Sequence, residues 1–195
     1  LWIAALAGIF AIMLVKEIYG GLGQNFMNPA VAGKIFALVS YGTLVANKGF
    51  ANASLAQKIL GTAGGNLGES SIVAILIGGI YLSVKGIIKV RVPLTIILTA
   101  LAFSFVVLGD VTILGGNSSI YLAAFFMAND YASSAITNWG KWIYALLLGV
   151  FASLFIGISK NGDGVYYAIL IANVFAPFID SFFTGKLDKK KEATA

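Results

Sequence analysis

Apolar runs of membrane-spanning length follow one another along most of this chain, with short polar segments between them. The clearest runs are Val92–Gly109, Trp142–Ser159 and Val165–Phe183. About 20 apolar residues at 1.5 Å per residue cross the ~30 Å hydrocarbon core of a bilayer. Hydrophobic residues make up 59 % of the sequence and charged residues only 11 %, too few charges to cover a surface that faces water. The chain is therefore predicted to be an integral membrane protein.

The order of these runs predicts an all-α fold, a polytopic membrane helix bundle with broken or re-entrant segments. We expect about six spans in a single transmembrane domain over 1–185, with a cytoplasmic, solvated Lys-rich tail over 186–195. The first span is expected to be cut short, because Leu1–Val15 opens the sequence inside an apolar run. That beginning is typical of a fragment with further residues upstream. Ser119–Ile136 is also expected to be a span, although Asn129 and Asp130 interrupt it.

The distribution of Lys and Arg predicts the orientation of the spans. Cytoplasmic loops carry an excess of these residues, and the strongest cluster outside the tail is Lys85–Arg91. Placing that loop and the tail in the cytoplasm leaves Asp110–Ser118, which has no basic residue, on the outer side. The longest polar stretch, Ala46–Ser70, then also lies outside. The net charge of +5 is clustered between apolar runs and does not form a nucleic-acid-binding face.

The sequence contains neither Cys nor His. This excludes a thiolate metal site, a Cys-ligated iron–sulfur cluster, a His-ligated haem and a Ser-His-Asp triad within this chain.

A glycine-rich segment, Gly20–Ala30, reads GGLGQNFMNPA and cannot form an uninterrupted helix. Irregular backbone at membrane depth persists only where protein buries it or where it lines a cavity. Free N–H groups around Gly21 and Gly23 can approach a phosphate or the edge of a flavin closely, and Asn25 and Asn28 can supply side-chain hydrogen bonds. The alternative interpretation is an ordinary turn at the membrane interface.

A second glycine-rich segment, Gly61–Ser71, precedes the apolar run Ser71–Val84. Ser70 or Ser71 can cap a helix there, and Glu69 suits the positive end of its dipole. The backbone at Gly64 and Gly65 is a further candidate for close approach to a cofactor, with Glu69 as a hydrogen-bonding group. A plain loop at the start of a helix is the alternative.

Two polar residues interrupt the run Ser119–Ile136. A charge at the bilayer centre costs about 2.5–3.5 kcal/mol on the insertion scale, so such residues face a bundle interior or a cavity. Hard cations prefer oxygen ligands, which makes Asn129 and Asp130 candidates for an ion path. A position near the interface, where that cost is small, is the alternative. Further along, Asn173 and Pro177 stand at i and i+4 and predict a packing device toward a neighbouring helix.

Together these motifs resemble one family. The chain carries GGLGQNFMNPA at Gly20–Ala30, GESS at Gly68–Ser71, FFMANDYASS at Phe125–Ser134 and DGVYYAILIANVFAPFID at Asp163–Asp180. In this order they resemble the D subunit of the Rnf electron-transport complex and its relative, the B subunit of the sodium-pumping NADH:quinone oxidoreductase. The resemblance covers nearly all of Leu1–Phe183. The family fold has about ten helices, so that roughly the first four are expected to be absent here.

The resemblance implies a function and a set of cofactors. Such subunits belong to a larger complex in the inner (cytoplasmic) membrane of bacteria or archaea, which moves electrons between ferredoxin and NAD and couples them to Na⁺ or H⁺ translocation. The family subunit carries FMN on a Thr of an S-G-A-T motif on the outer side, and some members also hold riboflavin. In this chain Ser54 stands at the acceptor position and Lys48 replaces the usual Asp, which puts covalent attachment in question. Thr62 is the alternative acceptor.

Three functional hypotheses follow. The first is a flavin-bearing subunit of an Rnf-type complex, with other membrane and peripheral subunits and the lipid bilayer as partners. The second is a structural and ion-path subunit of the same complex that has lost its flavin. The third is a stand-alone channel or transporter for a small polar solute.

Overall fold

The computed structural model contains helices and no strand among the residues that it describes, which are 1–21, 23–45, 54–62, 66, 68–109, 116–159 and 162–192. Three helices continue into wider π-helical turns, labelled η. The helices are α1 (Trp2–Ile9) continued by η1 (Phe10–Glu17), α2 (Pro29–Val45), α3 (Leu55–Leu60), α4 (Ile72–Val84), α5 (Arg91–Phe103) continued by η2 (Ser104–Leu108), α7 (Ser118–Leu122) continued by η3 (Ala123–Met127), α8 (Asn138–Ser159) and α9 (Gly164–Glu192). The all-α prediction is confirmed for this part of the chain.

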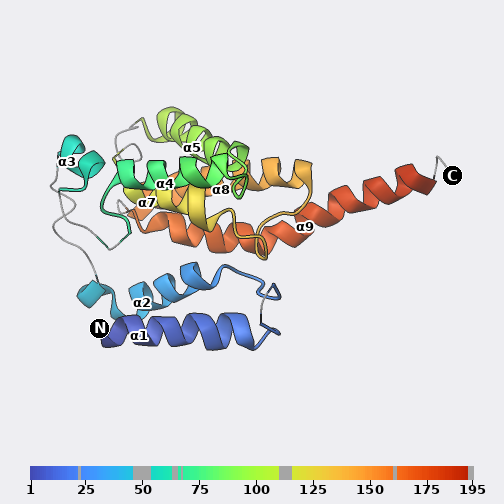
Figure 1. Ribbon diagram of the computed structural model, residues 1–195. Coiled ribbons are helices and arrows are strands. Elements are labelled where there is room, and N and C mark those ends of the chain that lie inside the picture. The colour runs from blue at the N-terminus through green and yellow to red at the C-terminus, as the bar shows by residue number, and fades with distance from the viewer. Residues whose placement is uncertain are drawn as a thin grey trace.

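Five of these helices gather in one bundle, which consists of α4, α5, α7, α8 and α9 (Figure 1). The closest packing joins α8 to α9 and α5 to α8. Below them in this view, α1 with η1 and α2 form an antiparallel pair, and α2 contacts α9. Helix α9 extends beyond the bundle and runs through Lys186, where the tail was expected to begin.

The core of the bundle mixes many alanines with large side chains such as Ile96, Leu148 and Tyr166, while many other large apolar residues lie outside it. The buried core includes Ala100, Ala124, Ala145, Ala152 and Ala172, whereas large apolar residues on all the longer helices are exposed. A protein in water buries its large apolar residues and does not leave such wide apolar surfaces open. In a bilayer, by contrast, lipid solvates large apolar groups, and small residues let helices approach closely. The packing is that of a membrane protein.

In the part of the chain that the structure describes, two helices are long and apolar enough, by length and composition, to cross a bilayer. They are α8 and the segment Gly164–Thr184 of α9. The expected span Ser119–Ile136 is wrong in its second half, because the helix ends at Met127 and the chain is irregular until α8 begins at Asn138. Asn129 and Asp130, where a broken segment was predicted, lie in this irregular stretch. Helix α8 begins at Asn138, four residues before the predicted start at Trp142.

Candidate functional site

The irregular segment before α2 meets the irregular segment after η3. Asn28 is the residue that joins them. Its Oδ1 accepts hydrogen bonds from the backbone N–H groups of Ala30 (3.0 Å) and Val31 (3.2 Å), which starts α2. Its Nδ2 donates to the carbonyl oxygen of Met127 at 3.1 Å, the last residue of η3. One buried amide therefore satisfies backbone groups of two helix ends that are 99 residues apart in the sequence.

Asp130 receives its hydrogen bonds from neutral donors. Its Oδ2 accepts from Ser133 Oγ at 2.7 Å and from Asn25 Nδ2 at 3.5 Å, and its Oδ1 accepts from the N–H of Ala132 at 3.4 Å. Asn129 turns back and donates to the carbonyl oxygens of Ala124 (2.9 Å) and Phe125, so it closes the end of η3. Asn25 and Asp130, which were singled out for different functions, are thus in contact.

Asn173 of α9 completes this cluster. With its amide oriented to suit its neighbours, it donates to Tyr144 OH (2.9 Å) and to the Ser133 carbonyl oxygen (3.2 Å) and accepts from the Asn28 N–H (3.0 Å). The predicted bond from Asn173 to a neighbouring helix is confirmed, because Tyr144 belongs to α8. We call Asn25, Asn28, Asp130, Ser133 and Asn173 the polar junction. Asn173 is the tenth of the 21 residues of the apolar segment Gly164–Thr184, so the polar junction lies beside the middle of that segment.

A second polar cluster surrounds Glu69, which lies in the loop before α4. Lys34 Nζ of α2 forms an ion pair with Glu69 Oε1 at 3.0 Å, and Tyr166 OH of α9 donates to the same oxygen. The other oxygen, Oε2, accepts from Ser119 Oγ of α7 at 3.0 Å and from Asn66 Nδ2 at 3.2 Å. Lys34 Nζ also lies 5.0 Å from the centre of the Tyr166 ring. We call these five residues the Glu69 cluster. The carboxylate has four side-chain partners, three of them on different helices.

Two opposing effects act on the Glu69 carboxyl group. Burial on its own would raise its pKa, because a charged group loses hydration. The positive charge of Lys34, with hydrogen bonds from Tyr166, Lys34 and Asn66, favours the ionised form more strongly and holds the pKa of Glu69 below its usual value. Glu69 is therefore a carboxylate at neutral pH.

Three helices connect the two clusters. Six residues separate Asn28 from Lys34 along α2, and seven separate Tyr166 from Asn173 along α9. At 1.5 Å per residue, both intervals correspond to about 10 Å. The helix formed by α7 and η3 begins beside the Glu69 cluster, with Ser119, and ends at the polar junction, with Met127. The seam between α2, α7–η3 and α9 therefore carries polar groups at two depths.

The remaining predicted site residues lie near the ends of elements. Gly21 and Gly23 have φ angles of +87° and +82°, which L side chains rarely adopt, and no atom lies within 4 Å of the position that a Cβ on Gly23 would take. Ser54 is exposed and is the N-cap of α3: its Oγ accepts from the N–H of Gln57 at 3.3 Å. Ser71, and not Ser70, caps α4. Gly64 and Gly65 lie outside the described residues.

Sequence reasoning missed Lys34, Ser119 and Tyr166 as members of a site. Lys34 carried a signal, because it interrupts the apolar run Ala30–Val45. Ser119 and Tyr166 carried none, since a hydroxyl in a membrane helix can bond within its own helix. Only the packing of α2, α7 and α9 shows that all three side chains meet at Glu69.

The fold and these buried polar clusters define a helical, multi-pass membrane protein, and the comparisons with known proteins agree. The chain matches the NQR2, RnfD, RnfE family over residues 1–187 and belongs to that family. It is 36 % identical to the D subunit of the Na⁺-translocating ferredoxin:NAD⁺ oxidoreductase complex of Acetobacterium woodii, over the whole chain and 70 % of that relative. It is 33 % and 32 % identical to the B subunits of the Na⁺-translocating NADH-quinone reductases of Ectopseudomonas mendocina and Haemophilus influenzae. The chain spans 57 % of the length of each of these two relatives.

Proposed function

We propose that this chain is a flavin-bearing membrane subunit of an ion-translocating oxidoreductase of the Rnf type, which passes electrons between ferredoxin and NAD. Its relatives are named as subunits of Na⁺-translocating oxidoreductase complexes, which supports the complex and its membrane location. The observation that carries the proposal is the polar junction. Two irregular segments far apart in the sequence meet beside the middle of the apolar segment of α9. Irregular backbone within a bilayer persists only around a ligand, a cavity or buried protein contacts.

The residues present are chemically suited to a flavin. The carbonyl oxygens and ring nitrogens of a flavin need hydrogen-bonding partners, and the backbone at Gly23 borders open space beside Asn25. The N–H of Gly21, predicted to be free, already donates to the Lys16 carbonyl oxygen at 3.0 Å, because the turn closes back on the end of η1. The exposed hydroxyl of Ser54 can form a phosphoester with FMN on the outer side. A bound flavin would supply one-electron transfer, and the chain would hold and orient it. Riboflavin has no phosphate and cannot form this phosphoester at Ser54. It would therefore bind at the segment Gly20–Asn28.

In this proposal the amide of Asn25, which bonds to Met27 and Asp130, and the backbone at Gly23 would lie against the ring. Asn28 and Asn173 hold the floor of the site by fixing the start of α2 against α9. About 10 Å away, the ion pair between Glu69 and Lys34 would hold α2 against the loop before α4.

Covalent FMN is tested by the fluorescence of the denatured chain. In the complex purified from cells that make all its subunits, the wild-type band should fluoresce in a denaturing gel, and Ser54→Ala should abolish the signal. Thr62→Ala is the matched control, because Thr62 is a second exposed hydroxyl in the same loop. Loss only in Thr62→Ala would move the acceptor to that residue. A wild-type chain with neither covalent nor acid-extractable flavin would refute the flavin proposal and favour the flavin-free ion-path subunit.

We further propose that Asp130 lies on the ion path. Among the described residues the ion pair Lys34–Glu69 is the only one, so the three neutral donors around Asp130 leave its negative charge uncompensated near mid-membrane. Such a charge attracts a cation such as Na⁺.

Replacing Asp130 tests this path. Asp130→Asn should raise the Na⁺ concentration for half-maximal ferredoxin:NAD activity by about tenfold, equivalent to about 1.4 kcal/mol. Ser133→Ala is the control, since it removes a hydrogen bond to Asp130 and keeps the charge. An unchanged Na⁺ dependence in a normally assembled Asp130→Asn complex would contradict the assignment.

A further inference from the structure

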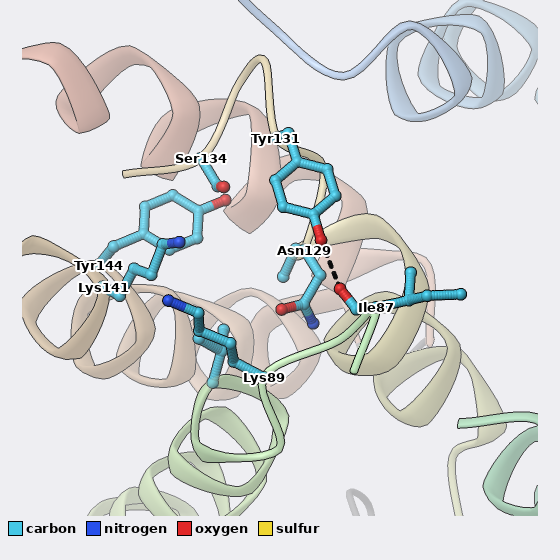
Figure 2. Close-up of a pocket in the computed structure, with 9 residues that line it drawn as sticks. Ile87, Lys89, Asn129, Tyr131, Ser134, Lys141 and Tyr144 are labelled. Atoms are coloured by element: carbon cyan, nitrogen blue, oxygen red, sulfur yellow. Dashed lines mark hydrogen bonds between the residues drawn. The ribbon is translucent and has the colours of Figure 1, made fainter. Parts of the chain in front are cut away.

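A pocket opens where several helix ends gather on one side of the bundle. It lies beside the loop between the end of α4 and the start of α5, next to the irregular segment that follows η3 and the first turn of α8. Its polar lining consists of Lys89, Asn129, Tyr131, Ser134, Lys141 and Tyr144. Figure 2 shows the amino groups of Lys89 and Lys141 pointing into the same space. Tyr131 OH donates to the Ile87 carbonyl oxygen and so ties this loop to the irregular segment.

Positive charge accumulates at this pocket without a matching anion. Lys89 and Arg91 both lie within electrostatic range of Lys141, and the opposing group there is Asp180. Asp180 is already engaged by the N–H groups of Ile136 and Thr137 and by the Thr137 hydroxyl. In the part of the chain that the structure describes, no carboxylate comes within ion-pair distance of these three cations.

A buried donor without a partner lies beside the lysines. The Nε of Arg91 is buried and has no hydrogen-bond partner among the described residues, while its other guanidinium nitrogen, Nη2, donates to Asn138 Oδ1 at 2.5 Å. A buried donor without an acceptor costs about 1–3 kcal/mol, so native proteins rarely leave one. The α5 and α8 helices also begin here, at Arg91 and Asn138, and add the positive ends of their dipoles. Lys89, Lys141 and the two helix starts favour an anion in the pocket, whereas Arg91 does not line it and adds only its charge.

The cationic mouth of the pocket, at Lys89 and Lys141, lies where α5 and α8 begin, and Tyr144 forms part of its inner wall. Because α5 and α8 begin at it, it marks the end of their apolar segments. Trp139 and Trp142 in the first turns of α8 are 71 % and 41 % exposed, and Tyr131 is 69 % exposed. Exposed Trp and Tyr at the ends of membrane helices are typical of the bilayer interface. Further along α8, the exposed side chains of Ile143 and Leu146 form an apolar surface that suits acyl chains.

We propose that this pocket binds the phosphate group of an anionic phospholipid. Lys89 and Lys141 contact the phosphate oxygens, Arg91 adds long-range attraction, and the acyl chains lie along α8. The bound lipid neutralises cations that otherwise repel one another and holds the loop before α5 against the irregular segment after η3. None of its cationic residues belongs to the polar junction, although Tyr144, which lines the pocket, bonds to Asn173 of that junction.

Lipid binding to the purified complex in mild detergent tests the proposal. Native mass spectrometry with dioleoyl phosphatidylglycerol should show bound lipid on the wild type, with dioleoyl phosphatidylcholine binding at least about tenfold more weakly. The double variant Lys89→Gln, Lys141→Gln should lose about tenfold or more in affinity for phosphatidylglycerol. Lys85→Gln is the matched control, because Lys85 belongs to the same loop, is exposed and does not line the pocket. It should bind like the wild type.

Other outcomes would overturn the proposal. Equal binding of both lipids, or full retention of phosphatidylglycerol by the double variant, would show that the pocket does not bind the lipid headgroup. Displacement of the lipid by millimolar inorganic phosphate assigns the pocket to a soluble anion, and a pocket occupied by a carboxylate of a neighbouring subunit assigns it to an interface. If the double variant does not assemble, the thermal shift that phosphatidylglycerol causes is compared between the wild type and Lys89→Gln. An equal shift in both contradicts the proposal.

Discussion

Asn28 and Asn173 show how single amides stabilise irregular backbone within a membrane. Each of them uses both its donor and its acceptor on groups that lipid could not satisfy, and Asn173 is only 1 % exposed. The polarity of these residues within apolar runs makes them recognisable in the sequence, because burying an amide without partners is costly. Their partners are not recognisable there, since Asn173 bonds with residues that are 29 or more positions away.

The ion pair between Lys34 and Glu69 is a second case in which individual residues stabilise the fold. Both side chains are largely buried, at 21 % and 10 % exposure, so removing one of them leaves a charged group without its partner. Lys34→Met or Glu69→Gln should each destabilise the complex by about 3 kcal/mol, the range measured for broken buried pairs. The double variant should cost clearly less than the sum of both.

Thermal unfolding of the purified complex would measure this coupling as a double-mutant cycle. Strictly additive losses would mean that the two groups do not interact, and the Glu69 cluster would then be held by its hydroxyl and amide contacts alone.

The elements of this fold depend on close approach between helices. A Cβ placed on Gly149 of α8 would lie 2.8 Å from the Cβ of Thr99 and 2.9 Å from the carbonyl oxygen of Ile96, both on α5. Gly149 therefore lets α8 pack directly against the backbone of α5, as small residues do in membrane bundles. The sequence shows abundant glycine, but it does not indicate which glycines face a helix and which face lipid.

Gly149→Val should destabilise the protein by about 1–3 kcal/mol, because the added methyl groups force α5 and α8 apart. Gly8→Val is the control: Gly8 lies in α1, is exposed, and has no atom within 4 Å of the position of a Cβ. The comparison is made by the thermal unfolding midpoint in the same detergent. Similar losses in both variants would point to the helix propensity of valine and not to packing.

At the scale of the whole molecule, the two polar clusters lie at different depths along one seam. If the predicted orientation holds, the Glu69 cluster lies toward the outer side with Ser54, and the cationic pocket lies toward the cytoplasm. The polar junction between them then lies where an electron carrier or an ion has to cross. An orientation opposite to the predicted one would exchange these positions and place Ser54 in the cytoplasm.

Single cysteines would determine this orientation, since the chain has no Cys of its own. In intact cells a membrane-impermeant maleimide should label Ala56→Cys, in the exposed face of α3, and should not label Lys85→Cys. Both should react after the cells are permeabilised, which is the control for accessibility. Labelling of Lys85→Cys alone in intact cells would reverse the predicted topology.

The sequence by itself determined the solvent, the helical class and the positions at which helices break. Apolar runs without water-facing charges require lipid, and Pro29, Asn129 and Asp130 mark stretches where helices begin or end, although Pro177 lies inside the continuous helix α9. Only the tertiary structure decided that Asn25 reaches Asp130, that Lys34, Ser119 and Tyr166 meet at Glu69, and that Lys89 and Lys141 share a pocket. The physical reason is the distance along the sequence over which each effect acts. Local propensity and hydration act within a few residues. These contacts depend on how whole helices pack, and packing follows from side-chain shape over the entire bundle.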